Sequence, residues 1–126
     1  MKKVNFLSRN GEDVTISAVL NFPGAFDEKK KYPAVVVSHP GGGVKEQTAG
    51  TYARKLAEKG FVTIAYDASY QGESTGEPRQ LENPYIRTED VSAAIRRRQT
   101  GILLRHVSNA HDRKEARAAD FAFGTL

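Results

Sequence analysis

The chain has 126 residues and a net charge of +4, and 39% of its residues are apolar and 27% charged, which suits one modest folded domain. It has no cysteine, which excludes disulfides, thiol catalysis and a cysteine-based zinc site. No apolar stretch follows the basic start, so we expect neither a signal peptide nor a membrane span, and the cytoplasm as the location.

The N-terminal part shows the patterns of a β-hairpin. Val4 and Phe6 alternate with polar neighbours, and Asn10-Gly11 offers the pair of positive-φ residues that a tight hairpin turn needs. Apolar residues at strict period two then predict a half-buried strand over residues 14–22. A continuous apolar run predicts a buried strand over residues 34–38.

A helix and another strand follow. Apolar residues recur at helical spacing over residues 49–57, and Gly60 provides a C-terminal cap. The run 61–66 predicts a second buried strand. Strand, helix and strand make a right-handed parallel unit, so with the hairpin we expect a mixed sheet with a mainly parallel interior.

Residues 67–76 form a long polar loop at the carboxyl end of that strand, the edge at which open α/β sheets bind ligands. Thr88 is the predicted N-cap of a second helix, with Glu89 and Asp90 at the positive end of its dipole. An apolar stripe begins at Val91 and should continue at positions 98 and 99, which are Arg and Gln. The helix therefore loses its buried face near residue 96.

The charge changes at the same place. Residues 1–95 carry 12 basic and 12 acidic residues, whereas residues 96–126 carry 7 basic and 3 acidic ones. We therefore divide the chain into residues 1–95 and a basic tail, residues 96–126. For the tail a solvated segment is favoured over nonspecific contact with nucleic acid, and its His106 and His111 lack a third metal ligand at suitable spacing.

The buried strand at residues 34–38 breaks into His39, Pro40 and three glycines. Backbone N–H groups of Gly41, Gly42 and Gly43 suit close approach to an anion, as in the oxyanion hole of acyl-transfer enzymes. The alternative, which we favour for this chain by itself, is a tight turn into a helix N-terminus that binds an anion weakly. For His39 we favour packing or hydrogen bonding over proton transfer.

The loop 67–76 offers a second set of candidates. Asp67, Ser69, Tyr70 and Ser74 line the predicted active-site edge. A nucleophilic serine needs a base that a third group holds, and nothing in the sequence places such a trio around Ser69. We therefore favour a polar loop whose turn Asp67 and the glycines shape.

With these elements in place, residues 39–50, 56–67 and 68–74 resemble the N-terminal third of an α/β-hydrolase. The similarity is to bacterial dienelactone-hydrolase-like or peptidase-like members and covers residues 1–95, whereas the tail, residues 96–126, resembles no part of the family. It implies an α/β fold with an incomplete sheet, in which the hairpin, the β-α-β unit and a second helix are present and the C-terminal half is missing. It also implies hydrolysis of ester, lactone, thioester or peptide bonds in a small acyl substrate through a nucleophile–His–acid triad, with no metal or organic cofactor.

The family carries its nucleophile on a Gly-x-Ser-x-Gly elbow after the next strand. Nothing in the chain is identified as such an elbow, as a cysteine variant, or as the triad acid or histidine. We therefore interpret the chain as a truncated, inactive hydrolase; a frameshift or misplaced stop near codon 96 is the hypothesis for the break. The exposed edge of strand 34–38 is expected to favour self-association. The alternative is a stand-alone binding module that uses the loops 39–46 and 67–76 or the basic tail.

Overall fold

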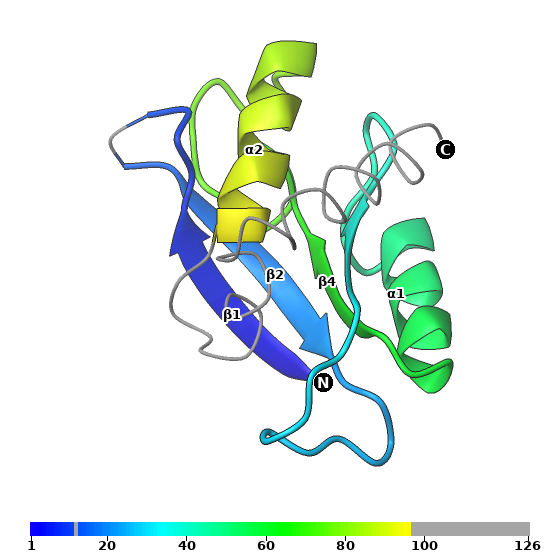
Figure 1. Ribbon diagram of the computed structural model, residues 1–126. Helices are drawn as coiled ribbons and strands as arrows, with labels where there is room; N and C mark the ends of the chain where they lie inside the picture. The colour runs from blue at the N-terminus through cyan, green and yellow to red at the C-terminus, as the bar shows by residue number, and fades with distance from the viewer. Residues whose placement is uncertain (12, 97–126) are drawn as a thin grey trace.

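The computed structural model describes residues 1–11 and 13–96, so the expectations for His106, His111 and the tail beyond Arg96 lie outside the described residues. These residues form one four-stranded sheet with the strand order β1-β2-β4-β3 (Figure 1). The elements, in chain order, are β1 (Lys2–Leu7), β2 (Thr15–Asn21), β3 (Ala34–Ser38), α1 (Thr48–Glu58), β4 (Val62–Tyr66) and α2 (Pro84–Arg96).

The sheet is mixed, as expected. β1 pairs with β2 and β2 pairs with β4, both antiparallel. β3 pairs with β4 in parallel, and α1 connects these two strands along the chain. The hairpin and the β-α-β unit are thus confirmed. The expected mainly parallel interior is wrong for the described strands, because β2 of the hairpin pairs antiparallel with β4 and only β3 and β4 pair in parallel. In this part of the chain β3 has a neighbour on one side only.

The two helices cover opposite faces of the sheet, and β4 shows why. Its alternate residues Val62, Ile64 and Tyr66 join a core cluster that includes Ala94 of α2. Ala65, between them, packs instead with Ala49 and Ala53 of α1. Successive strand residues point to opposite faces, so a fully buried strand such as β4 requires a helix on each side. Figure 1 shows β4 lying between α1 and α2.

Helix α1 agrees with its prediction, and Gly60 takes the left-handed conformation of a C-terminal cap, with φ +98°. Helix α2 begins at Pro84, ahead of the predicted N-cap Thr88, so that prediction is wrong. The reason is local chemistry: Tyr85 N–H donates to Asn83 Oδ1 at 2.9 Å, and proline suits a first helical position. Thr88 lies inside the helix, where its hydroxyl donates to Pro84 O.

The turn predicted at Asn10-Gly11 is also wrong in detail. Neither residue has a positive φ, and the connection runs from Ser8 to Val14, whose N–H and C=O are joined at 2.7 Å. The side chain of Asn10 instead donates to Asp90 Oδ1 at 2.8 Å and to the carbonyl of Ile86 at 2.9 Å. The longer connection thus carries an amide that is hydrogen-bonded to α2.

Candidate functional site

The two loops selected from the sequence meet at the carboxyl ends of β3 and β4. Ala68 N–H donates to His39 Nε2 at 3.0 Å, and Lys45 N–H donates to Asp67 Oδ1 at 2.7 Å. The carboxyl ends of parallel strands share one edge of a sheet, which is where ligands bind in open α/β folds. The structure thus brings residues 39–46 and 67–76 together at that edge.

His39 is buried and uses both ring nitrogens. Nε2 accepts from Ala68 N–H, and Nδ1 lies 2.8 Å from the carbonyl of Pro40, to which it donates. Burial is the largest cause that lowers the pKa of His39 below its ordinary value, so the neutral ring is favoured. These contacts fit the packing and hydrogen-bonding role and leave neither nitrogen available as a base.

The three loop glycines differ in their surroundings. Gly43 is buried and its N–H donates to Pro40 O at 3.0 Å, as in a tight turn. Gly42 is exposed, has φ +71°, and donates its N–H to Glu82 Oε1 at 3.2 Å. Gly41 is exposed, and its N–H makes no hydrogen bond within the described part of the chain. Gly41 therefore carries the N–H group that is free to face a ligand, whereas the N–H of Gly42 is occupied by Glu82.

A buried lysine, which the sequence analysis missed, fixes the geometry of these loops. Lys45 Nζ lies 2.7 Å from each of the carboxylates of Glu46, Asp67 and Glu73. Burial works to lower the pKa of Lys45, but its hydrogen bonds with the three carboxylates together raise it above its ordinary value. Lys3 and Lys45 in turn lower the pKa of Glu73 to about 2.

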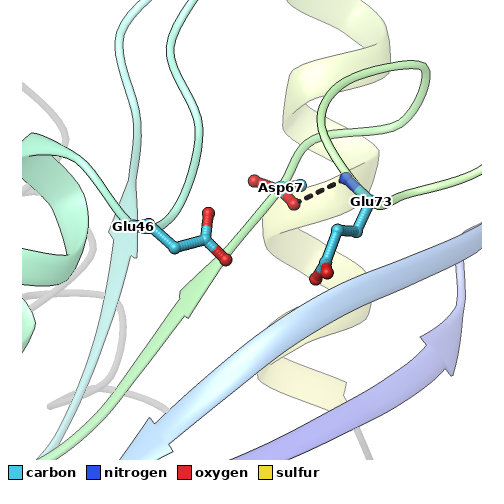
Figure 2. A group of neighbouring side chains, drawn as sticks. All are labelled: Glu46, Asp67 and Glu73. Carbon is cyan, nitrogen blue, oxygen red and sulfur yellow. Dashed lines mark hydrogen bonds between the residues drawn. The ribbon is translucent and has the colours of Figure 1, made fainter.

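Figure 2 shows the three carboxylates turned toward one another, with ligand atoms within 4.8 Å, a spacing that would suit a metal ion. The Lys45 ammonium already lies among them and supplies the positive charge. Asp67 is fully buried, so it requires such a counter-charge. The cluster therefore acts as a clamp between the β3–α1 loop and the loop after β4.

The loop after β4 wraps closely around Asp67. Glu73 N–H donates to Asp67 Oδ2 at 2.9 Å. Gly72 has φ +48°, and a Cβ there would lie 2.5 Å from the Asp67 carboxylate. Tyr70, also in the left-handed region with φ 71°, covers Gly76 with its ring. These contacts agree with the interpretation that Asp67 and the glycines shape the turn.

Ser69 belongs to a second buried polar group. Its hydroxyl lies 2.6 Å from Asp90 Oδ1, and its N–H donates to Asp90 Oδ2 at 2.8 Å. Ser8 and Asn10 also donate to Asp90. The group contains no histidine that could act as a base for Ser69. Ser69 instead joins its loop to Asp90 of α2 and to Ser8 of the β1–β2 connection. Asp90, expected at the helix terminus, is instead the fully buried acceptor of this group.

One Gly-x-Ser-x-Gly spacing does occur, at Gly72–Gly76, and the sequence interpretation overlooked it. Its Ser74 is buried; the hydroxyl donates to Asp67 O at 2.7 Å and accepts from Ser17 N–H at 2.9 Å. A nucleophile elbow joins a strand directly to a helix and exposes its serine. Ser74 lies within the loop between β4 and α2, so this motif is a structural turn.

Comparison with known proteins places these features in a family. A sequence profile of the dienelactone hydrolase family matches residues 18–122, so the family match extends past the expected boundary at residue 95 into the tail. The chain is similar to the Escherichia coli protein YcjY, with 74% identity over 93 residues, which are 74% of this chain and 30% of that protein. It thus spans less than a third of this relative. Neither α1 nor α2 has the length and apolar composition of a membrane-spanning helix.

Two solved structures show the same partial fold. Hypothetical protein PA2218 from Pseudomonas aeruginosa is 48% identical, with a TM-score of 0.69 over 75% of this chain and 28% of that one. The α/β hydrolase GrgF from Penicillium is 26% identical, with a TM-score of 0.64 over 75% of this chain and 30% of that one. The described residues therefore correspond to part of an α/β-hydrolase fold.

Proposed function

Because this chain belongs to the dienelactone hydrolase family, we propose that it is the N-terminal part of a hydrolase of ester, lactone, thioester or peptide bonds. In this proposal the part supplies the oxyanion loop and lacks a nucleophile. The family assignment agrees with the resemblance seen in residues 39–74. The substrate of the whole enzyme is a small molecule with an acyl group, and the site requires no metal or organic cofactor.

The observation that carries the proposal is a difference between the two loops: two glycines of the loop after β3 are exposed, whereas the serines of the loop after β4 are buried. Gly41 and Gly42 are exposed at the carboxyl end of β3, and the N–H of Gly41, which has no partner among the described residues, can face a developing oxyanion. Ser69 and Ser74, in the neighbouring loop, are buried and hydrogen-bonded to structural partners. A nucleophile needs an exposed hydroxyl and a positioned base, and neither serine has them. These differences support the proposal that the described residues supply the oxyanion side of an acyl-transfer site.

The proposal predicts no catalysis by the isolated chain. We expect its turnover of p-nitrophenyl acetate and p-nitrophenyl butyrate to equal that of Ser69→Ala and Ser74→Ala variants and to stay at the level of free imidazole. Turnover that either serine substitution abolishes would show a nucleophile in this chain and overturn the proposal.

A stand-alone binding module is the second candidate, and one observation favours it. The Lys45 cluster cross-links the loops 39–46 and 67–76 using described residues alone. A rigid polar edge of this kind can bind without catalysis. A purified chain that is monodisperse and unfolds in one cooperative transition supports this role. An aggregated or partly unfolded chain contradicts it.

A further inference from the structure

A carboxylate of this chain lies where the glycine loop would meet an anion. Glu82 Oε1 accepts from Gly42 N–H at 3.2 Å and from Gln71 Nε2 at 3.3 Å. The same oxygen lies 2.6 Å from Arg87 Nη2, and Oε2 accepts from Arg87 Nε at 3.0 Å. Donors from three separate segments therefore converge on one side chain.

The converging donors have the features of a carboxylate site. The planar guanidinium of Arg87 presents two parallel N–H groups to both oxygens of Glu82, the arrangement that binds a carboxylate in two places at once. Backbone and amide N–H groups complete it from the side. Gly41 does not crowd the carboxylate position, since even a Cβ at residue 41 would lie 3.9 Å from Glu82 Oε1.

Arg87 is held in place independently of Glu82. Its Nη1 donates to the carbonyl of His39 at 2.9 Å, and its side chain is 19% exposed. Glu82 is different: its side chain is 40% exposed and lies in the stretch before α2. If the carboxylate of Glu82 swings into solvent, Arg87, Gly42 and Gln71 keep their donors directed at the vacated position.

We propose that Glu82 is a tethered, displaceable carboxylate that fills a carboxylate-binding site formed by Gly42, Gln71 and Arg87. A ligand with a free carboxylate takes the place of the Glu82 side chain, pairing with Arg87 and accepting from Gly42 N–H. Hydrogen bonding with Arg87 lowers the pKa of Glu82, so the internal carboxylate stays ionised and competes with the ligand near neutral pH. The proposal stands on these contacts and does not depend on hydrolytic activity.

The test titrates the full chain with sodium acetate, against sodium chloride at equal ionic strength, and follows the NMR signals of Gly42 N–H and Arg87 Nε–H. Glu82→Ala removes the competitor, so acetate should bind at least about tenfold more tightly than to the unchanged chain. Glu82→Gln, which keeps the shape, tests the same point if the alanine variant unfolds. Glu58→Ala, which removes the same charge from an exposed position on α1, should behave as the unchanged chain.

The double variant Glu82→Ala, Arg87→Gln should lose the acetate response. The proposal fails if folded Glu82→Ala and Glu82→Gln show no acetate-specific shift, or if the response survives loss of Arg87. Because the readout is binding to the isolated chain, its failure leaves the proposed hydrolytic role standing, and failure of that role leaves this result standing.

Discussion

At the scale of single residues, Lys45 is the side chain on which the geometry of the site depends most. It is fully buried, and its ammonium holds the buried carboxylate of Asp67 together with Glu46 and Glu73. A buried carboxylate without a counter-charge is strongly destabilising. His39 also joins the two loops, because its Nε2 accepts from Ala68 N–H while its Nδ1 donates to Pro40 O.

Lys45→Met should lower the free energy of unfolding by about 3–5 kcal/mol, because it leaves Asp67 buried and unpaired. Urea denaturation monitored by circular dichroism measures the change. Lys55→Met, at an exposed position of α1, is the matched control and should change stability by less than about 0.5 kcal/mol. Equal losses in the two variants would contradict a clamping role for Lys45.

His39 predicts a pH dependence of stability. Its pKa in the folded chain lies below the ordinary value of 6.5, so the unfolded chain takes up a proton first as the pH falls. The stability that neutral His39 contributes is therefore complete above pH 6.5 and lost as the pH falls through the lower folded pKa. Thermal unfolding midpoints across this range should fall more steeply in the unchanged chain than in His39→Asn; parallel curves would rule the effect out.

At the scale of elements, the loop between β4 and α2 connects the parts of the site. It surrounds Asp67, covers Gly76 with Tyr70, and reaches α2 through the contact between Ser69 and Asp90. Its path depends on Gly72, which has a left-handed backbone conformation. Gly72 lies so close to the Asp67 carboxylate that there is no space for a Cβ atom.

Gly72→Ala should destabilise the chain by more than about 2 kcal/mol, because strain at φ +48° adds to a contact of 2.5 Å with Asp67. Gly24→Ala, at a position with no heavy atom within 4 Å and no positive φ, is the control and should have little effect. A denaturation midpoint for Gly72→Ala as high as that of the control would show that the loop can take another path.

The same scale shows what the sequence predicts and what it does not. Period-two and helical patterns identified β2 and α1, because burial of one face repeats along a single element. The predicted start of α2 at Thr88 is wrong, since Asn83 and Pro84 outweigh Thr88 at the helix terminus. The parallel β-α-β unit predicts that the loops after β3 and β4 lie side by side. It does not predict the ion pair that joins them, because Lys45 and Asp67 are 22 residues apart and meet only in the folded chain.

At the scale of the whole molecule, the described sheet ends at β3, whose residues carry no charge. Strand edges without charged residues pair readily with other strands. The chain also spans only 30% of the E. coli relative and 28% of the solved PA2218 chain. In relatives of that length, further polypeptide is available to pack against this part of the fold.

We expect the purified chain to self-associate through the edge of β3. Size-exclusion chromatography with light scattering should show dimers or larger species that shift toward monomer in Ala34→Lys, because an exposed lysine on an edge strand opposes pairing. Ala25→Lys adds the same charge in an exposed loop and should leave the distribution unchanged. A monomeric unchanged chain, or equal shifts in both variants, would exclude this edge.

The most direct measurement of the central claim, that this chain supplies the oxyanion side of a hydrolase, is ester turnover by a chimera. The matching 93-residue segment of the E. coli relative YcjY is replaced by that of this chain, and both proteins are assayed on p-nitrophenyl esters. We expect turnover by YcjY, turnover by the chimera within about tenfold of it, and none by this chain alone. No turnover by YcjY, or a folded chimera without activity, would contradict this role.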